Sequence, residues 1–124
     1  MKQKIIECVP NISEGRNQTK IMTIANVVKS VEGVKLLDVD PGKATNRTVI
    51  TFDGEPEKVI DAALLLIKKA AELIDMSKQT GEHPRFGATD VCPFIPIANI
   101  SMEETTAYAH KLGRRVGEEL GISG

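Results

Sequence analysis

The feature of this sequence that most constrains its fold is a long apolar stripe between residues 56 and 74. Its members recur at steps of three and four, which is the spacing of one face of an α-helix. Asp53-Gly54-Glu55-Pro56 precedes the stripe, and proline is well tolerated in the first turn of a helix. The stripe consists of Val59, Ile60, Ala63, Leu64, Ile67, Ala71 and Ile74. A helix with so broad an apolar face is expected to lie across a sheet.

Shorter patterns on both sides of this helix predict the strands of that sheet. Apolar runs predict strands at Lys4–Pro10, Val34–Val39, Arg47–Phe52 and Val91–Ile97. Within the third of these, Val49 and Phe52 fit an alternating pattern that Ile50 breaks. The prolines Pro93 and Pro96 place the last strand at an edge or a bulge.

Two further helices complete the pattern. Apolar residues at Ile21, Ile24, Val28 and Val31 predict a helix over Gln18–Val31. Ser101 with Glu104 forms a capping-box pattern before a last helix. That helix is striped by Thr105, Tyr108, Leu112, Val116 and Leu120.

The order of these elements predicts one α/β (α+β) domain over residues 1–124. The first six elements follow the ferredoxin-like βαββαβ order, an open sheet with helices packed on one face, and a C-terminal helix follows. We expect turns or loops at Asp40-Pro41-Gly42, at Asn11–Asn17 and over Met76–Thr89.

Composition narrows the possible partners. The 124 residues carry a net charge of −1, and only 3% are aromatic, so neither nucleic acid nor a membrane is an expected partner. No apolar run approaches the roughly 20 residues that cross a bilayer. The chain opens without a signal-like apolar segment, so we expect a cytoplasmic protein in which Cys8 and Cys92 are free thiols.

Of the two histidines, His83 is the better candidate for chemistry. It lies in the long predicted loop before Pro84, which restricts the backbone of the preceding residue, whereas His110 falls within the last helical pattern. Imidazole is suited to proton transfer near neutral pH. From the loop alone, a surface histidine without function is an equally good interpretation.

A second group of candidates surrounds the predicted turn after the second strand. Asp38 and Asp40 point to the same face of a strand, where they could orient a histidine or hold an ammonium group. Arg47 starts the next strand and could pair with these aspartates or bind a substrate carboxylate with two hydrogen bonds. Turn formation by Asp40 and an ordinary surface charge at Arg47 remain open alternatives.

The loop Asn11–Asn17 follows the first strand, and such loops commonly line ligand crevices. Gly15 within it permits close approach of the backbone. A metal site built from Cys8, His83 and Cys92 matches no familiar zinc spacing, so no metal is expected.

Three sequence blocks resemble the glutamate formiminotransferase family. They are Glu7-Cys8-Val9-Pro10-Asn11-Ile12-Ser13-Glu14-Gly15, then Leu36-Leu37-Asp38-Val39-Asp40 with Thr45-Asn46-Arg47-Thr48-Val49, and finally Thr80-Gly81-Glu82-His83-Pro84-Arg85 with Ala88–Pro96. The blocks occur in the family's order and cover nearly the whole chain. Such a match is highly specific.

The resemblance implies transfer of a formimino group from N-formimidoyl-L-glutamate to the co-substrate tetrahydrofolate, in histidine degradation and without a metal. It implies that His83 is the catalytic base and that Asp40 assists it. As residues that bind folate or glutamate derivatives it implies Asn11, Glu14, Arg47, Glu82 and Arg85.

The resemblance also implies a partner. The family's transferase has two similar subdomains with folate between them, and we also expect a homo-oligomer. This chain matches the first subdomain, and the family continues beyond Leu120 into a further strand and the second subdomain. Three interpretations follow: half of a split enzyme, a fragment of a longer enzyme, or a non-catalytic module that binds folate or a protein.

Overall fold

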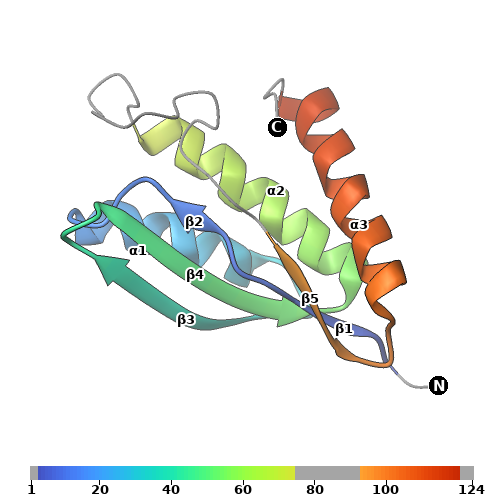
Figure 1. Cartoon of the computed structure of the whole chain (residues 1–124). Helices are drawn as coiled ribbons and strands as arrows, with labels where there is room; N and C mark the ends of the chain where they lie inside the picture. The colour runs from blue at the N-terminus through green and yellow to red at the C-terminus, as the bar shows by residue number, and fades with distance from the viewer. Residues whose placement is uncertain (1–2, 75–92, 121–124) are drawn as a thin grey trace.

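The computed structural model describes residues 3–74 and 93–120, which form an open five-stranded antiparallel sheet with three α-helices (Figure 1). The strands are β1 (Ile5–Cys8), β2 (Asn11–Ile12), β3 (Val34–Gly42), β4 (Arg47–Gly54) and β5 (Phe94–Ala98). The helical segments are α1 (Gln18–Asn26), the 3₁₀ turn η1 (Val27–Ser30), α2 (Pro56–Leu73), α3 (Met102–Arg115) and the π-helical turn η4 (Val116–Leu120).

The sheet has the predicted ferredoxin-like connectivity. β4 pairs with β3 on one side and with β1 and β2 on the other, and β5 pairs with the far side of β1. All these pairs are antiparallel, because the connections through α1 and through α2 each skip one strand. The ferredoxin-like prediction is therefore confirmed.

β1 and β2 form what is in effect one strand with a short interruption. Cys8 pairs with Phe52 and Asn11 pairs with Val49, so the register against β4 is the same on both sides of Val9–Pro10. The carbonyl oxygen of Pro10 still accepts a hydrogen bond of 3.0 Å from the Ile50 amide. The prediction of a loop from Asn11 onward was wrong for its first two residues, because β4 is long enough to pair with them.

β4 separates the two faces of the sheet by strict alternation. Thr48, Ile50, Phe52 and Gly54 are buried, whereas the residues between them are only partly buried. Ile50 therefore belongs to the core face and Val49 to the other face. The expectation that Ile50 interrupts the pattern was wrong, because the alternation is set by Ile50 with Phe52 and not by Val49.

β3 extends further than its sequence predicts. Asp40-Pro41-Gly42 was expected to form a turn, yet these residues pair with Val49, Thr48 and Arg47 of β4, and the turn lies at 43–46. β3 is an edge strand, where a proline can be accommodated because one side of the strand has no ladder to complete. A register shift between Leu36 and Asp38 marks a bulge in the same strand.

β5 forms the other edge and begins at Phe94, later than the predicted Val91, while Val91 and Cys92 lie outside the described residues. The Val9 amide donates to the Pro93 carbonyl, so alternation along the ladder turns the nitrogen of Pro96 away from β1. The prediction of an edge position for Pro96 is confirmed.

α2 supplies most of the helical side of the core. Pro56 occupies its first turn as predicted, and the stripe is buried at Val59, Ile60, Ala63, Leu64, Ile67 and Ile74. Ala71 was placed on this face wrongly: it is exposed, and Ala70 is buried in its place. These side chains pack onto the core face of the sheet, chiefly onto Ile6, Cys8, Ile12, Ile50 and Phe52.

α1 begins where the sequence predicts, because the Asn17 side chain accepts a hydrogen bond from the Lys20 amide. The predicted helix to Val31 is wrong in its last turn: regular α-helix ends at Asn26 and continues as η1 to Ser30. The predicted apolar face is buried at Ile21, Ile24 and Val28, and Val31 is partly buried.

α3 is capped as predicted and is tied to α2 by charges. Ser101 accepts a hydrogen bond from the Glu104 amide, while the Glu104 carboxylate pairs with Lys4 near the start of the chain. Thr105, Leu112 and Val116 are buried, and Tyr108 and Leu120 pack partly against the core.

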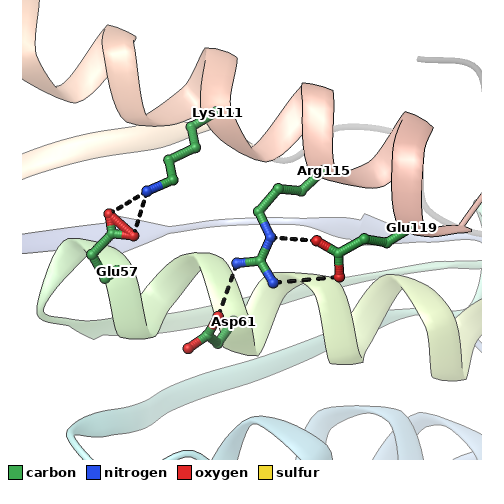
Figure 2. Close-up of polar contacts among 5 residues, drawn as sticks. All are labelled: Glu57, Asp61, Lys111, Arg115 and Glu119. Carbon is green, nitrogen blue, oxygen red and sulfur yellow. Dashed lines mark hydrogen bonds and ion pairs between the residues drawn. The ribbon is translucent and has the colours of Figure 1, made fainter.

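Two basic side chains of α3 reach across to acidic ones of α2 (Figure 2). Lys111 pairs with Glu57 at 2.7 Å and Arg115 pairs with Asp61 at 2.9 Å. Arg115 also pairs with Glu119 in η4, and these hydrogen bonds raise the pKa of Arg115 and lower that of Glu119. Two ion pairs thus connect α3 to α2, in addition to the apolar contacts of its buried face.

Cys8 is buried, and Cys92 lies outside the described residues, so the expectation of two free thiols stays a prediction. Among the helices that the structure describes, none is both long and apolar enough to cross a membrane.

Candidate functional site

All three α-helices of the described chain pack toward the core face of the sheet, so the opposite face carries the accessible strand side chains (Figure 1). We refer to this second face as the open face. The strand residues on it are exposed or only partly buried. The predicted site residues can therefore be assigned to a face by the strand pairing.

Asp40 lies on the open face of β3. It pairs with Val49, and Asp38 pairs with Thr51, and both positions of β4 belong to the open face. The two aspartates thus share a face, as predicted, and both are exposed. Asp38 lies in the strand as predicted, whereas Asp40 also lies in the strand and not in the expected turn.

Arg47 begins β4 on the same face. It stands two residues before Val49, which makes it the diagonal neighbour of Asp40 across the β3–β4 pair. Diagonal positions lie about 7–8 Å apart, a distance that a long side chain can cover. Arg47 is partly buried. The structure therefore places the two residues that the sequence singled out at diagonal positions of one sheet face.

Asn11 reaches the same row from the other side of β4. It pairs with Val49 in β2, while Asp40 pairs with Val49 in β3. Neighbouring strands lie about 4.8 Å apart, so Asn11 and Asp40 flank Val49 at a separation of about 10 Å. Asn11, Asp40 and Arg47 accordingly form one polar group around Val49 at the end of the open face.

Glu14 lies in the loop that leads from β2 to α1. Its carboxylate oxygen Oε2 accepts hydrogen bonds of 3.1 Å from the amides of Arg16 and Asn17. At least one oxygen of this carboxylate therefore organises the loop itself. A direct contact of Glu14 with substrate remains a prediction.

The same loop is fixed against the β3–β4 hairpin. The Gly15 amide donates to Oδ1 of Asn46 at 2.9 Å, and the buried Thr48 hydroxyl donates to the Glu14 carbonyl. Nε of Arg16 donates to the Lys43 carbonyl at 3.0 Å. Sequence reasoning did not identify Asn46 or Thr48, although both lie within a block that carries the family resemblance.

The predicted catalytic histidine is not among the residues that the structure describes. His83, Glu82 and Arg85 fall within 75–92, so the expectation that they lie near Asp40 and Arg47 stays a prediction. Two members of the rejected metal trio, His83 and Cys92, fall in the same segment. In the described residues, no group of three or more His, Cys, Asp or Glu side chains is arranged to hold a metal.

A row of charged residues continues the open face across the sheet to β5. Lys35, Asp53 and Glu7 stand opposite one another in three strands, and Glu7 in turn pairs with Ile95 of β5. Ile95 and Ile97 are 41% and 51% exposed, unusually high values for isoleucine. The open face is thus polar near Asn11 and apolar near β5.

His110 is an exposed residue of α3, as predicted. It borders an open hollow between α3 and β5, together with Phe94, Thr105 and Gly113. That hollow lies beside α3 and not among the open-face positions around Val49. His110 is therefore remote from the polar group on the sheet.

The comparisons with known proteins agree with the three sequence blocks. A family model described as the formiminotransferase domain, N-terminal subdomain, matches residues 5–124. The chain belongs to this formiminotransferase family.

Its relatives include longer proteins named formimidoyltransferase from several organisms. The formimidoyltransferase-cyclodeaminase of Gallus gallus is 55% identical over 119 residues, which are 96% of this chain and 22% of that protein. The glutamate formimidoyltransferase of Thermoplasma acidophilum is 52% identical over 118 residues, or 95% of this chain and 39% of that protein.

The glutamate formimidoyltransferase of Streptococcus pyogenes serotype M1 is 47% identical over 119 residues, 96% of this chain and 40% of that protein. The chain therefore spans between about a fifth and two fifths of the length of these formiminotransferases.

Proposed function

We propose that this chain forms one half of a glutamate formiminotransferase active site. The reaction moves a formimino group from N-formimidoyl-L-glutamate to tetrahydrofolate and yields 5-formimidoyltetrahydrofolate and L-glutamate. The observation that carries the proposal is the grouping of Asn11, Asp40 and Arg47 around Val49 on an accessible sheet face. Relatives named glutamate formimidoyltransferase, about half identical to this chain, support the choice of reaction.

The chemistry requires little beyond proton transfer and orientation. The attacking nitrogen of tetrahydrofolate adds to the formimino carbon and gives a tetrahedral intermediate, from which the glutamate nitrogen leaves. The first nitrogen loses a proton and the second gains one. A single imidazole can accept that proton and return it. We assign this role to His83, because the resemblance matches it to the family's catalytic histidine.

The residues around Val49 would orient the reactants. Asp40 is suited to hold the imidazolium of His83 or an attacking ammonium, since a nearby carboxylate stabilises either cation. Arg47 is suited to bind a carboxylate of the glutamate moiety, because its guanidinium offers two parallel hydrogen bonds. Asn11 can donate to or accept from polar groups of the ligand. Glu82 and Arg85 complete the proposed set on the basis of the resemblance.

The open face would be closed by a second formiminotransferase subdomain. Folate is larger than one flat sheet face can enclose, and ligand sites usually bury most of their ligand. Exposed Ile95 and Ile97 offer an apolar area for such a contact. The relatives' greater length supports the existence of further domains in the family. Homo-oligomer formation, a cytoplasmic location and a place in histidine degradation belong to the same proposal.

A reconstitution assay tests the proposal. The purified chain is mixed with N-formimidoyl-L-glutamate and tetrahydrofolate, alone and with a supplied C-terminal subdomain from the family, and 5-formimidoyltetrahydrofolate is followed. We expect turnover in the complete mixture and little or none from the chain alone. If a folded chain with a competent second subdomain yields no product but binds folate, the chain is a binding module and the proposal is wrong.

A further inference from the structure

Asn46 has a backbone conformation that few residues adopt. Its φ of 54° lies in the left-handed region, and among the described residues only one other non-glycine residue, Asn99, has a positive φ. Asparagine tolerates this region better than most side chains do. Asn46 closes the four-residue loop between β3 and β4, directly before Arg47. Its backbone therefore determines how the chain enters the strand that carries Arg47.

The side chain of Asn46 connects this hairpin to a distant segment. Oδ1 accepts the Gly15 amide at 2.9 Å across a separation of 31 residues, in a partly buried position. Gly15 lies directly against the hairpin: a Cβ added there would stand 2.6 Å from the Arg47 amide nitrogen. The loop that carries Glu14 and the strand that carries Arg47 are thus joined by one amide oxygen.

Two further hydrogen bonds join the same segments but from other residues. The Thr48 hydroxyl donates to the Glu14 carbonyl, and Nε of Arg16 donates to the Lys43 carbonyl. They hold the loop and the hairpin together even without the Asn46 amide. Loss of that amide should therefore loosen the geometry locally and leave the fold intact.

We propose that Asn46 is a positioning residue that fixes Glu14 and Arg47 relative to each other for binding the glutamate moiety of the substrate. This inference rests on the proposed function, which places Arg47 in the substrate site, and on the family resemblance, which implies that Glu14 also binds the substrate. Asn46 is not assigned a contact with substrate. It acts through the Gly15 amide and through the left-handed entry into β4, and small displacements of binding groups are known to reduce activity strongly.

Three substitutions separate the backbone role from the side-chain role. Asn46→Gly keeps the left-handed backbone and removes the acceptor for Gly15. Asn46→Asp keeps both the backbone tolerance and an oxygen acceptor. Asn99→Gly is the matched control. Asn99 lies on the connection between β5 and α3 and has the same backbone conformation, with φ 57°, and its side-chain amide donates to the Gln3 carbonyl.

The test is made in the transferase assembled from this chain and a C-terminal subdomain. We expect Asn46→Gly to raise KM for N-formimidoyl-L-glutamate by about tenfold, the effect of losing one well-made hydrogen bond, with a smaller change in kcat. Asn46→Asp should restore KM to within about threefold of the wild type, and Asn99→Gly should leave it unchanged. Hydrogen exchange at the Gly15 amide should accelerate only in Asn46→Gly.

The outcomes distinguish the two claims. If the unmodified assembly shows no turnover, the proposed function fails and the positioning role fails with it. If the assembly is active and Asn46→Gly leaves KM unchanged while the Gly15 amide exchanges faster, the positioning role alone is overturned. An equal rise in KM for Asn46→Gly and Asn46→Asp would also overturn it, because the acceptor would then be irrelevant.

Discussion

Gly15 lies so close to Gly42 that a Cβ added to Gly15 would stand 2.3 Å from the Gly42 carbonyl oxygen. The neighbouring atoms are backbone, and they belong to the ends of β3 and β4, where Asp40 and Arg47 are presented. Neither strand can move away without losing its pairing. The contact therefore makes the packing of the β2–α1 loop and the integrity of the candidate site interdependent.

We predict that Gly15→Ala destabilises the chain by about 2–3 kcal/mol, at the upper end of the cost of overpacking, because rigid backbone cannot yield as a side chain can. Urea unfolding followed by circular dichroism measures this directly. Unchanged stability would mean that the loop does not lie against the hairpin as described.

Gly113 should give the opposite result. It lies within α3, and apart from its chain neighbours and the backbone of its own helix, an added Cβ would meet no atom of the described residues within 4 Å. Alanine is favoured over glycine in a helix interior, so Gly113→Ala should stabilise the chain by about 0.5–1 kcal/mol. The same urea titration serves both variants. A loss of stability would contradict the open surroundings of this position.

The buried hydroxyl of Thr48 offers a test of the link to Glu14. Thr48→Val keeps the shape and removes the donor to the Glu14 carbonyl, so we expect a loss of about 1 kcal/mol or more. Thr106→Val is the matched control, because the Thr106 hydroxyl donates to the Met102 carbonyl on an exposed helix face. Its effect should stay within about 0.5 kcal/mol. Equal effects in the two variants would show that the link carries no special weight.

Arg115→Ala tests the attachment of α3 to α2. Removal of both ion pairs should cost about 1 kcal/mol at low ionic strength, since these side chains are partly accessible to solvent. The cost should shrink in about 1 M salt, which screens exposed charges. Arg114→Ala is the control, because Arg114 is exposed on the same helix and forms no ion pair with another described residue. A cost that does not depend on salt would point to packing by the arginine stem.

Lowering the pH should remove part of the difference in stability between the wild type and Arg115→Ala. Arg115 lowers the pKa of Glu119, so this ion pair stabilises the fold at every pH above the ordinary pKa of a glutamate. The contribution is lost as the pH falls through the lowered pKa. The gap in stability between the wild type and Arg115→Ala should therefore narrow below about pH 4, as measured by urea unfolding at several pH values.

Much of the fold could be predicted because long patterns have few interpretations. The stripe of α2 demanded a sheet beneath it, and the order of elements gave the ferredoxin-like connectivity that the strand pairing confirms. The errors lie where local preference and tertiary pairing compete. Asp40-Pro41-Gly42 favours a turn by composition, yet β4 is long enough to hold it as an edge strand.

The candidate site divides in the same way. Asp38, Asp40 and Arg47 could be chosen from the sequence because they surround a recognisable turn signal and because side chains alternate regularly along a strand. Their grouping with Asn11 depends on β2 pairing with β4, which two residues cannot signal. The sequence did not point to Asn46, because its left-handed backbone and its hydrogen bond to a residue 31 positions away produce no repeating sequence pattern.

The catalytic assignment has its own test. In the assembled transferase, His83→Ala should lower turnover by about two to four orders of magnitude, the usual range for loss of a general base. His110→Ala should leave turnover unchanged, because His110 is an exposed residue of α3. Full activity of His83→Ala, with folding intact, would remove His83 from the mechanism.

The shared register of β1 and β2 limits how this domain can vary in length. Because side chains alternate, adding or deleting a single residue between Cys8 and Asn11 would invert the parity of β2 against β4. The side-chain amide of Asn11 would then turn toward the helices, and the side chain of Ile12, which is now buried, would face outward. A one-residue insertion at Val9–Pro10 should therefore disrupt the domain. The exposed loop residues 43–45 are not in a strand, so an insertion there does not reverse the face of any strand side chain.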